Sequence, residues 1–200
     1  MFASPAVQRP LALLNWLALT AMLAAICAVL LAAMGFQYIG GEIPCPLCLL
    51  ERAAMFGVCF GILLQLRGGF SYQNTGFGLL SALFLLIVAT RQSLLDIYPR
   101  PGHEYIGSAI FGIHMPVWSI LIALALLIGF SLKLAVLGGD RHLQEHPAAS
   151  FPAIAKAAAV LGPLVIALCA INLISVGVQC GLGQCHTTGY LLIDGPQPGG

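Results

Sequence analysis

The chain has 200 residues, of which 60% are hydrophobic and only 8% are charged, and its formal net charge at pH 7 is +1. Its mean hydropathy is +0.97, whereas soluble proteins carry about a quarter charged residues. This composition excludes an ordinary soluble domain and indicates an integral membrane protein. Because the net charge is so small and no basic patch is present, nothing favours nucleic acid as a partner.

Five apolar runs follow one another along the chain, each close to the ~20 residues that a membrane-spanning helix needs. Only helices satisfy their own backbone hydrogen bonds over such long segments in lipid. The first run is longer than the apolar core of a cleaved signal peptide, so we expect it to remain as a helix. We predict an all-α, single membrane domain over residues 1–200, with spans at 11–36, 47–66, 77–95, 115–137 and 151–178.

Basic residues near the ends of these spans predict the orientation. Most of them fall on the side of the N-terminus, and one lies well clear of a span on the opposite side. The first group is Arg9, Arg67, Lys133, Arg141 and Lys156, and the single residue is Arg100. The positive-inside rule therefore predicts a cytoplasmic N-terminus and, after five spans, a periplasmic C-terminus.

The seven cysteines agree with this orientation. Three lie inside apolar runs and are interpreted as small packing residues, namely Cys27, Cys59 and Cys169. The other four form two pairs, Cys45/Cys48 and Cys180/Cys185. The predicted topology places both pairs on the outer face of the membrane, where disulfides persist, whereas the reverse topology would place them in the reducing cytosol.

The stretch from Ile43 to Arg52, IPCPLCLLER, carries the most chemistry. Its prolines discourage helix before Leu47, so Cys48 is expected in the first helical turn, where the helix dipole favours a thiolate. Arg52 follows four residues later on the same helical face and holds a permanent positive charge. This arrangement is typical of a redox-active dithiol. A structural disulfide and half of a four-cysteine zinc site remain alternatives.

At this point the residues resemble a known family. PCPLCLLERAAMFG is similar to the first outer loop and second helix of the DsbB family of membrane disulfide-bond formation proteins. FQY at 36–38, LLDIYPRPG at 94–102 and IHMPVW at 113–118 match further family stretches in the right order. The resemblance covers roughly residues 11–137 and implies a four-helix transmembrane bundle, to which this chain adds a fifth helix.

The resemblance also implies a function. It suggests a multi-pass enzyme of the bacterial inner membrane, a thiol:quinone oxidoreductase that reoxidises a periplasmic, DsbA-like dithiol oxidase and so supports disulfide formation in exported proteins. The electron acceptor would be ubiquinone or menaquinone. By the family pattern Cys48 would contact the quinone and Arg52 would support its site, while Gln92 stands where the family often has a histidine.

One departure from the family matters most. Members usually carry a second cysteine pair in the loop between helices three and four, but Asp96–His114 has none. We hypothesise that Cys180/Cys185 replaces it and passes electrons from the soluble partner to Cys45/Cys48. One alternative is a static disulfide in a structural membrane protein. Another is covalent haem at Cys180 and Cys185, with His186 as axial ligand. No metal site is expected.

Overall fold

The computed structural model describes residues 5–97, 109–137, 140–181, 185 and 190–194. Within them lie five long helices, each long and apolar enough to cross a membrane. They are α1 (Pro5–Tyr38), α2 (Pro46–Gly68), α3 (Tyr72–Ile97), α4 (Met115–Leu137) and α6 (Pro152–Cys180). The predicted all-α membrane fold is confirmed. Four of the predicted spans fall inside these helices. The fifth predicted span begins at Phe151, one residue before α6, because Phe151 is the N-cap of that helix.

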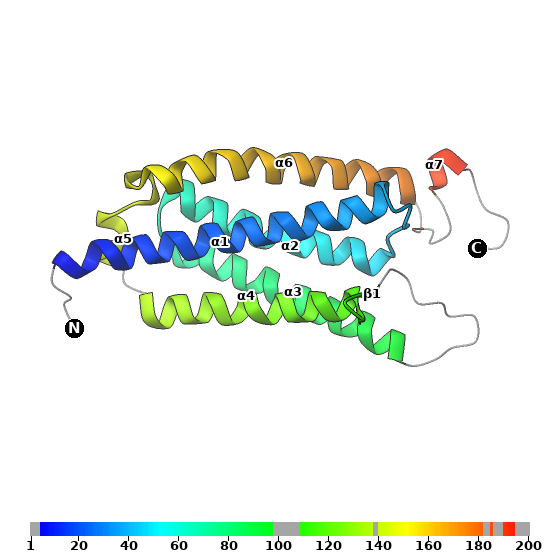
Figure 1. The fold of residues 1–200 in the computed structure, drawn as a ribbon, viewed down its shortest axis with the longest axis horizontal. Coiled ribbons are helices and arrows are strands. Elements are labelled where there is room, and N and C mark those ends of the chain that lie inside the picture. Colours follow the sequence, from blue (N-terminus) through cyan, green and yellow to red (C-terminus); the bar gives the residue numbers. More distant parts are fainter. Residues whose placement is uncertain (1–4, 98–108, 138–139, 182–184, 186–189, 195–200) are drawn as a thin grey trace.

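Helices α1 to α4 form a bundle, and α6 lies along one side of it (Figure 1). Helix α2 packs along α3, α3 packs along α4, and α1 closes the bundle against α2 and α4. Helix α6 contacts α1 and α2. The end of the bundle where α2 and α4 begin and where α6 finishes is called the CxxC end below. The opposite end carries the short helix α5 (Asp140–Glu145) and is called the α5 end.

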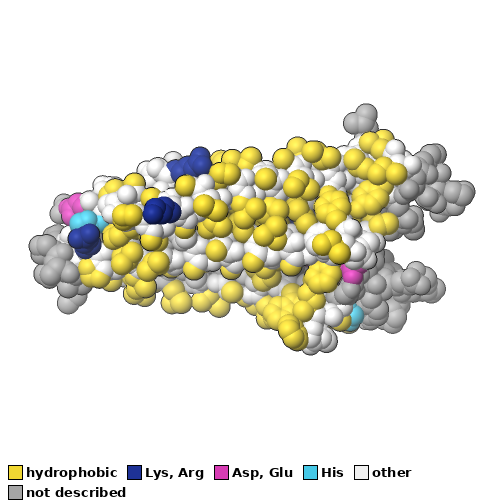
Figure 2. Space-filling view, turned by 45° about the horizontal axis from the view of Figure 1, so that its top comes forward, with side chains coloured by type: hydrophobic (Ala, Val, Ile, Leu, Met, Phe, Trp, Pro, Cys, Tyr) yellow, Lys and Arg dark blue, Asp and Glu magenta, His cyan; other side chains and the backbone are white. Residues whose placement is uncertain are grey.

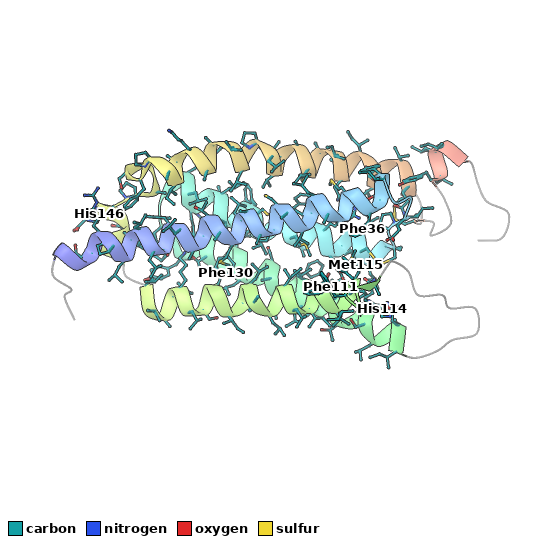
Figure 3. All side chains as sticks on the ribbon, viewed as in Figure 1. Phe36, Phe111, His114, Met115, Phe130 and His146 are labelled. Carbon is teal, nitrogen blue, oxygen red and sulfur yellow. A yellow bond between two sulfur atoms is a disulfide. The ribbon has the colours of Figure 1, made fainter. Side chains whose placement is uncertain are left out.

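Small residues let α3 approach its neighbours closely. Gly57 and Gly61 form a small-xxx-small pattern on α2 that faces α3, a pattern common where membrane helices pack tightly. A Cβ atom on Gly61 would lie 3.0 Å from the backbone N of Gly78. On the α4 side, Phe130 fills the space above Gly78 in the middle of the bundle (Figure 3). Close packing of this kind fixes which residues of α2, α3 and α4 can meet.

The outer surface of the bundle is apolar along its length. Figure 2 shows hydrophobic side chains covering the long face, while the Lys and Arg side chains in view gather toward the α5 end. Large aliphatic residues such as Leu80 and Leu173 point outward and are about two-thirds exposed or more, at 68% and 71%. An apolar exterior of this extent is expected of a surface in contact with lipid.

Several short elements connect the helices. A hairpin of β1 (Ala109–Ile110) and β2 (Ile113–His114) precedes α4, with Ala109 opposite His114. Its turn contains Phe111 at φ 53°, an uncommon conformation for a bulky residue, and Gly112. The 3-10 helix η1 (Ala148–Ser150) leads into α6, and α7 (Leu191–Asp194) follows it. The hairpin was not predicted, and residues 98–108 of the same connection lie outside the described part of the chain.

Candidate functional site

The CxxC pair lies where the chain enters α2. Cys45 is the N-cap residue, with extended backbone at φ −71° and ψ 160°, and Pro46 takes the first helical turn, where a missing N–H costs no helical hydrogen bond. The backbone N–H of Cys48 donates to Cys45 Sγ at 3.1 Å. The two thiols are not bridged, and Cys45 is buried while Cys48 is partly exposed. The local sequence thus places two unbridged cysteines at the start of a helix, with Cys48 in the first helical turn as predicted.

Gln92 reaches Cys48 from α3. Its Nε2 donates to Cys48 Sγ at 3.3 Å, a bond that favours negative charge on the sulfur. The family resemblance suggested that Gln92 helps to hold the quinone. Instead its described contact is with the thiol, and it is not among the residues that line the adjacent pocket. Arg91, its neighbour, is exposed on the outside of the bundle.

Arg52 is 8% exposed and extends from α2 toward α1. Its guanidinium donates to Gln37 Oε1 at 2.5 Å and to the carbonyl of Ala33 at 3.1 Å. Both acceptors are uncharged, so hydrogen bonding holds the side chain in place without neutralising its charge. A buried cation of this kind is able to stabilise an anion that forms beside it.

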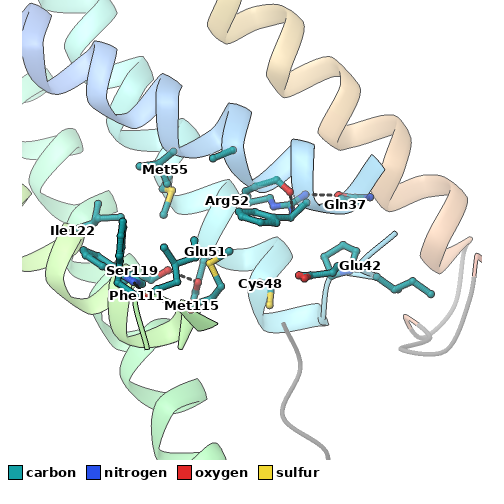
Figure 4. A pocket seen from close by; sticks show the side chains of 18 residues that line it. Gln37, Glu42, Cys48, Glu51, Arg52, Met55, Phe111, Met115, Ser119 and Ile122 are labelled. Carbon is teal, nitrogen blue, oxygen red and sulfur yellow. Dashed lines mark hydrogen bonds between the residues drawn. The ribbon is translucent and has the colours of Figure 1, made fainter. Parts of the chain in front are cut away.

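A pocket of about 310 Å³ opens beside these residues (Figure 4). Its walls are mostly apolar and come from α1, from the β1–β2 hairpin and from α4, while α2 supplies Cys48, Glu51 and Arg52. The apolar walls include Val29, Phe36, Phe111, Met115, Trp118 and Ile122. Figure 3 shows Phe36, Phe111 and Met115 together at the CxxC end. Cys48 and Arg52 both line this space, so a thiol and a cation face one cavity.

Glu51 is a pocket residue for which the sequence analysis predicted no role. It is 6% exposed, and its Oε2 accepts a hydrogen bond from Ser119 Oγ of α4 at 2.6 Å. The signal in the sequence was a carboxyl group inside an apolar span, which marks a functional position by default in a membrane protein. Ser119 gave no such signal, because a serine in a membrane helix most often serves packing.

The second cysteine pair lies at the same end of the bundle. Cys180 is the last residue of α6 and forms a disulfide with Cys185, with the two Cα atoms 4.0 Å apart. Gly181 follows at φ 57°, a left-handed conformation that suits glycine and lets the chain turn away from the helix. The two sulfur atoms are therefore bonded to each other. Covalent haem would need both as free thiols, and its proposed ligand His186 lies outside the described residues.

Hydrogen bonds tie the end of α6 to the CxxC site. Gln179 Nε2 donates to the carbonyl of Pro44 at 2.7 Å, so the residue before Cys180 holds the residue before Cys45. One turn earlier on α6, Ser175 Oγ accepts from Gln37 Nε2 at 2.6 Å, and Gln37 also accepts from Arg52. Tyr190 OH accepts a further bond from Gln37 at 3.1 Å. The fifth helix is thus part of the site, and Gln37 and Gln179 are residues that sequence reasoning missed.

The known proteins that resemble this chain are all disulfide bond formation proteins. Residues 15–104 match the family described as "Disulfide bond formation protein DsbB". A "Disulfide bond formation protein B" from Paracidovorax citrulli is 40% identical over 95 residues, which is 42% of this chain and 54% of that protein. Proteins of the same name from Acidovorax sp. and Azoarcus sp. are 36% and 32% identical over 96 and 118 residues, or 44% and 52% of this chain.

The matched region spans 55% and 65% of those last two relatives, so the chain covers between half and two-thirds of the length of its relatives. No solved structure matches the chain. The helices α1 to α3, the CxxC motif and Arg52 all lie within or overlap the matched residues 15–104. Over residues 15–104 the chain is therefore similar to the DsbB family of disulfide bond formation proteins.

Proposed function

We propose that the chain is a thiol:quinone oxidoreductase of the bacterial inner membrane. It would reoxidise a periplasmic, thioredoxin-like dithiol oxidase and pass the electrons through Cys180/Cys185 and Cys45/Cys48 to a membrane quinone. The family match supports a role in disulfide bond formation. The observation that carries the finer proposal is that one pocket exposes both the Cys48 thiol and the buried Arg52 cation.

The pocket suits a quinone headgroup. Its volume of about 310 Å³ lies at the lower end of the range for small-molecule sites, and such sites combine apolar walls with a few convergent polar groups. A bound quinone would supply an oxidant that accepts two electrons and two protons. Arg52 would face the negative charge that develops there, Gln92 would hold Cys48 in place, and the apolar walls would exclude water.

The relay consists of thiol–disulfide exchange until its last step. A thiolate of the soluble partner attacks the Cys180–Cys185 disulfide, and the resulting dithiol then attacks a Cys45–Cys48 disulfide. The second exchange leaves Cys180–Cys185 oxidised and Cys45/Cys48 reduced. The hydrogen bond from Gln179 to Pro44 supports this order, because it joins the chain immediately before each pair.

Two assays on the purified protein test the proposal. The first measures quinone reduction driven by a reduced thioredoxin-like oxidase, and the second replaces that protein with a small dithiol. We expect Cys48→Ser to abolish both activities, and Cys180→Ser and Cys185→Ser to abolish only the first. Cys169→Ser is the matched control, because it changes an exposed thiol on the outside of the bundle, and it should retain both activities.

Two outcomes would contradict the proposal. Turnover by Cys48→Ser would show that this thiol does not reduce the acceptor. Equal loss of both activities in the Cys180 and Cys185 variants would show that the C-terminal pair is not a relay. Trapping a mixed disulfide between the soluble oxidase and single-cysteine variants at positions 180 and 185 identifies which of the two sulfurs meets the partner.

A further inference from the structure

Glu51 is a buried carboxyl group to which the proposed relay assigns no role. One oxygen, Oε2, accepts a hydrogen bond from Ser119, while Oε1 is buried and has no hydrogen-bond partner among the described residues. A buried polar atom without a partner costs about 1–3 kcal/mol, and more for an ionised group. A carboxyl group kept in such a place within a membrane bundle indicates a function.

Glu51 lies beside the Cys48 thiol in the wall of the pocket. It lies three residues after Cys48 on α2, so the two side chains share a face of the helix. Both line the pocket. Figure 4 shows Glu51 directed toward Ser119 on one side, while Arg52 is directed the other way, toward Gln37. The carboxyl group of Glu51 is therefore held by α4 and the guanidinium of Arg52 by α1.

The proposed reaction needs a proton source at this place. When Cys45 and Cys48 form a disulfide they release two electrons, and the acceptor takes up those electrons with two protons. If Cys48 reacts as a thiolate, the Cys45 thiol provides one of the protons, and a second must come from elsewhere. A protonated side chain that lines the pocket beside Cys48 is a direct source of this proton.

We propose that Glu51 is the catalytic proton carrier of this site, with Ser119 as the residue that positions it. This inference rests on the proposed function. In the oxidative step, Cys45–SH, Cys48–S⁻, protonated Glu51 and the acceptor give the Cys45–Cys48 disulfide, ionised Glu51 and the two-electron, two-proton reduced acceptor. The Cys180/Cys185 dithiol then reduces the inner disulfide to Cys45–SH and Cys48–S⁻. The proton left over returns to Glu51, so charge and protons balance over the cycle.

The charged and titratable groups around Glu51 are consistent with this cycle. Cys48 and Arg52 lie on the same helix, Asp96 is near it at the end of α3, and α4 presents the neutral Ser119. Glu42, from the connection before α2, lines the same pocket. A proton on Glu51 avoids two adjacent negative charges whenever Cys48 is a thiolate, and ionisation of Glu51 becomes favourable once Cys48 enters the disulfide.

The test compares Glu51→Gln, Glu51→Asp and Ser119→Ala with the wild-type protein, and Glu145→Gln on the exposed surface of α5 is the matched control. In the small-dithiol assay we expect Glu51→Gln to lower the quinone reduction rate by about tenfold or more. Glu51→Asp should recover part of the rate, and Ser119→Ala should change the pH profile. Mixed-disulfide formation with the soluble oxidase should stay at the wild-type level in all variants.

An infrared readout tests the carboxyl group without turnover. The difference spectrum between the reduced and oxidised CxxC pair should contain a protonated-carboxyl C=O band, which Glu51→Gln removes and Ser119→Ala shifts to higher frequency. If the band persists in Glu51→Gln, or if that variant turns over at the wild-type rate with an unchanged pH profile, the inference is wrong. If instead the wild-type protein reduces no quinone, the proposed function itself fails.

Discussion

At the scale of single residues, the two cysteines of one motif have different environments. Cys45 is 6% exposed, and the side-chain hydrogen bond between its thiol and that of Cys48, together with burial, raises the pKa of Cys45. Cys48 lines the pocket and receives a hydrogen bond from Gln92. The raised pKa of Cys45 keeps this thiol protonated at neutral pH. Cys48 is therefore suited to react first, and Cys45 to close the disulfide.

This difference predicts selective alkylation. In the reduced protein at pH 6–8, iodoacetamide should modify Cys48 well before Cys45. Modification of Cys45 should hardly increase with pH in that window, because a raised pKa moves thiolate formation to higher pH. Peptide mass spectrometry over time measures both rates. In Cys48→Ala, Cys45 keeps the backbone N–H bond from position 48 but loses the side-chain hydrogen bond that raises its pKa, so it should become more reactive. Equal rates at the two sites in the wild-type protein would contradict the asymmetry.

Substitution of Arg52 should change the KM for quinone. Arg52→Met removes the cation but keeps much of the apolar stem, so it should raise the KM for quinone by about tenfold, roughly the value of one charge-assisted hydrogen bond. Arg52→Lys keeps the charge without the planar guanidinium and should fall between Met and wild type. Steady-state kinetics at varied quinone concentration provide the measurement. An unchanged KM with a slower partner reaction would place Arg52 in the other half of the relay.

At the scale of elements, α6 is the part that distinguishes this chain from a four-helix bundle. Its last turns carry Ser175 and Gln179, whose hydrogen bonds reach Gln37 at the end of α1 and Pro44 before the CxxC pair. These contacts are buried, and each net hydrogen bond is worth about 1 kcal/mol. They hold the end of α6, and with it Cys180, against the entry to α2.

Loss of the hydrogen bond between Gln179 and Pro44 should slow the reaction with the soluble partner and spare the reaction with quinone. Gln179→Leu removes the bond to Pro44, and we expect partner-driven quinone reduction to fall by about fivefold, corresponding to about 1 kcal/mol. Reduction driven by a small dithiol should stay near the wild-type rate, because Cys45 and Cys48 remain accessible to it. Leu173→Ala, on the exposed face of α6, is the control and should leave both rates unchanged. A parallel loss in both assays would mean that Gln179 only supports the fold.

At the scale of the whole molecule, both cysteine pairs lie at the end of the bundle where α2 begins and α6 finishes, and α1 begins at the other end (Figure 1). The basic residues used to infer orientation are mostly at the N-terminal end, with one change. Lys133 is buried inside the bundle, where its Nζ donates to Gln65 Oε1 at 2.5 Å and lies over the ring of Phe70. It therefore belongs to the packing of α4 rather than to a loop, and Arg9, Arg67, Arg141 and Lys156 carry the charge bias.

The orientation is testable by labelling. We expect a cysteine introduced at Ile39, at the CxxC end and 91% exposed, to react with an impermeant maleimide added to intact spheroplasts. A cysteine introduced at Gln73, at the opposite end of the bundle, should react only after the membrane is permeabilised. Both changes belong in a background without other cysteines. The reverse pattern would place both native cysteine pairs in the cytosol and would contradict the relay as well.

Much of the site was predictable from the sequence where it depends on neighbours along one helix. The positions of Cys45, Cys48 and Arg52 follow from a proline-marked helix start and a spacing of four residues. The hydrogen bond of Gln92 to Cys48 was not predicted, because the family pattern suggested only that Gln92 belongs to the quinone site. Gln37, Ser119 and Gln179 were not predicted, because each has a hydrogen-bond partner on another element that lies 68 to 138 residues away along the chain.

The sequence by itself determined the five spans, the two cysteine pairs and the cation beside the first pair. These features are local, because apolar run length and helical spacing act over about 20 residues or fewer. Only the tertiary structure decided that α6 closes on the CxxC site, that Arg52 turns to Gln37, and that Glu51 turns to Ser119. The physical reason is that buried polar groups in a membrane bundle must find partners on neighbouring helices, and helix packing alone decides which partners are within reach.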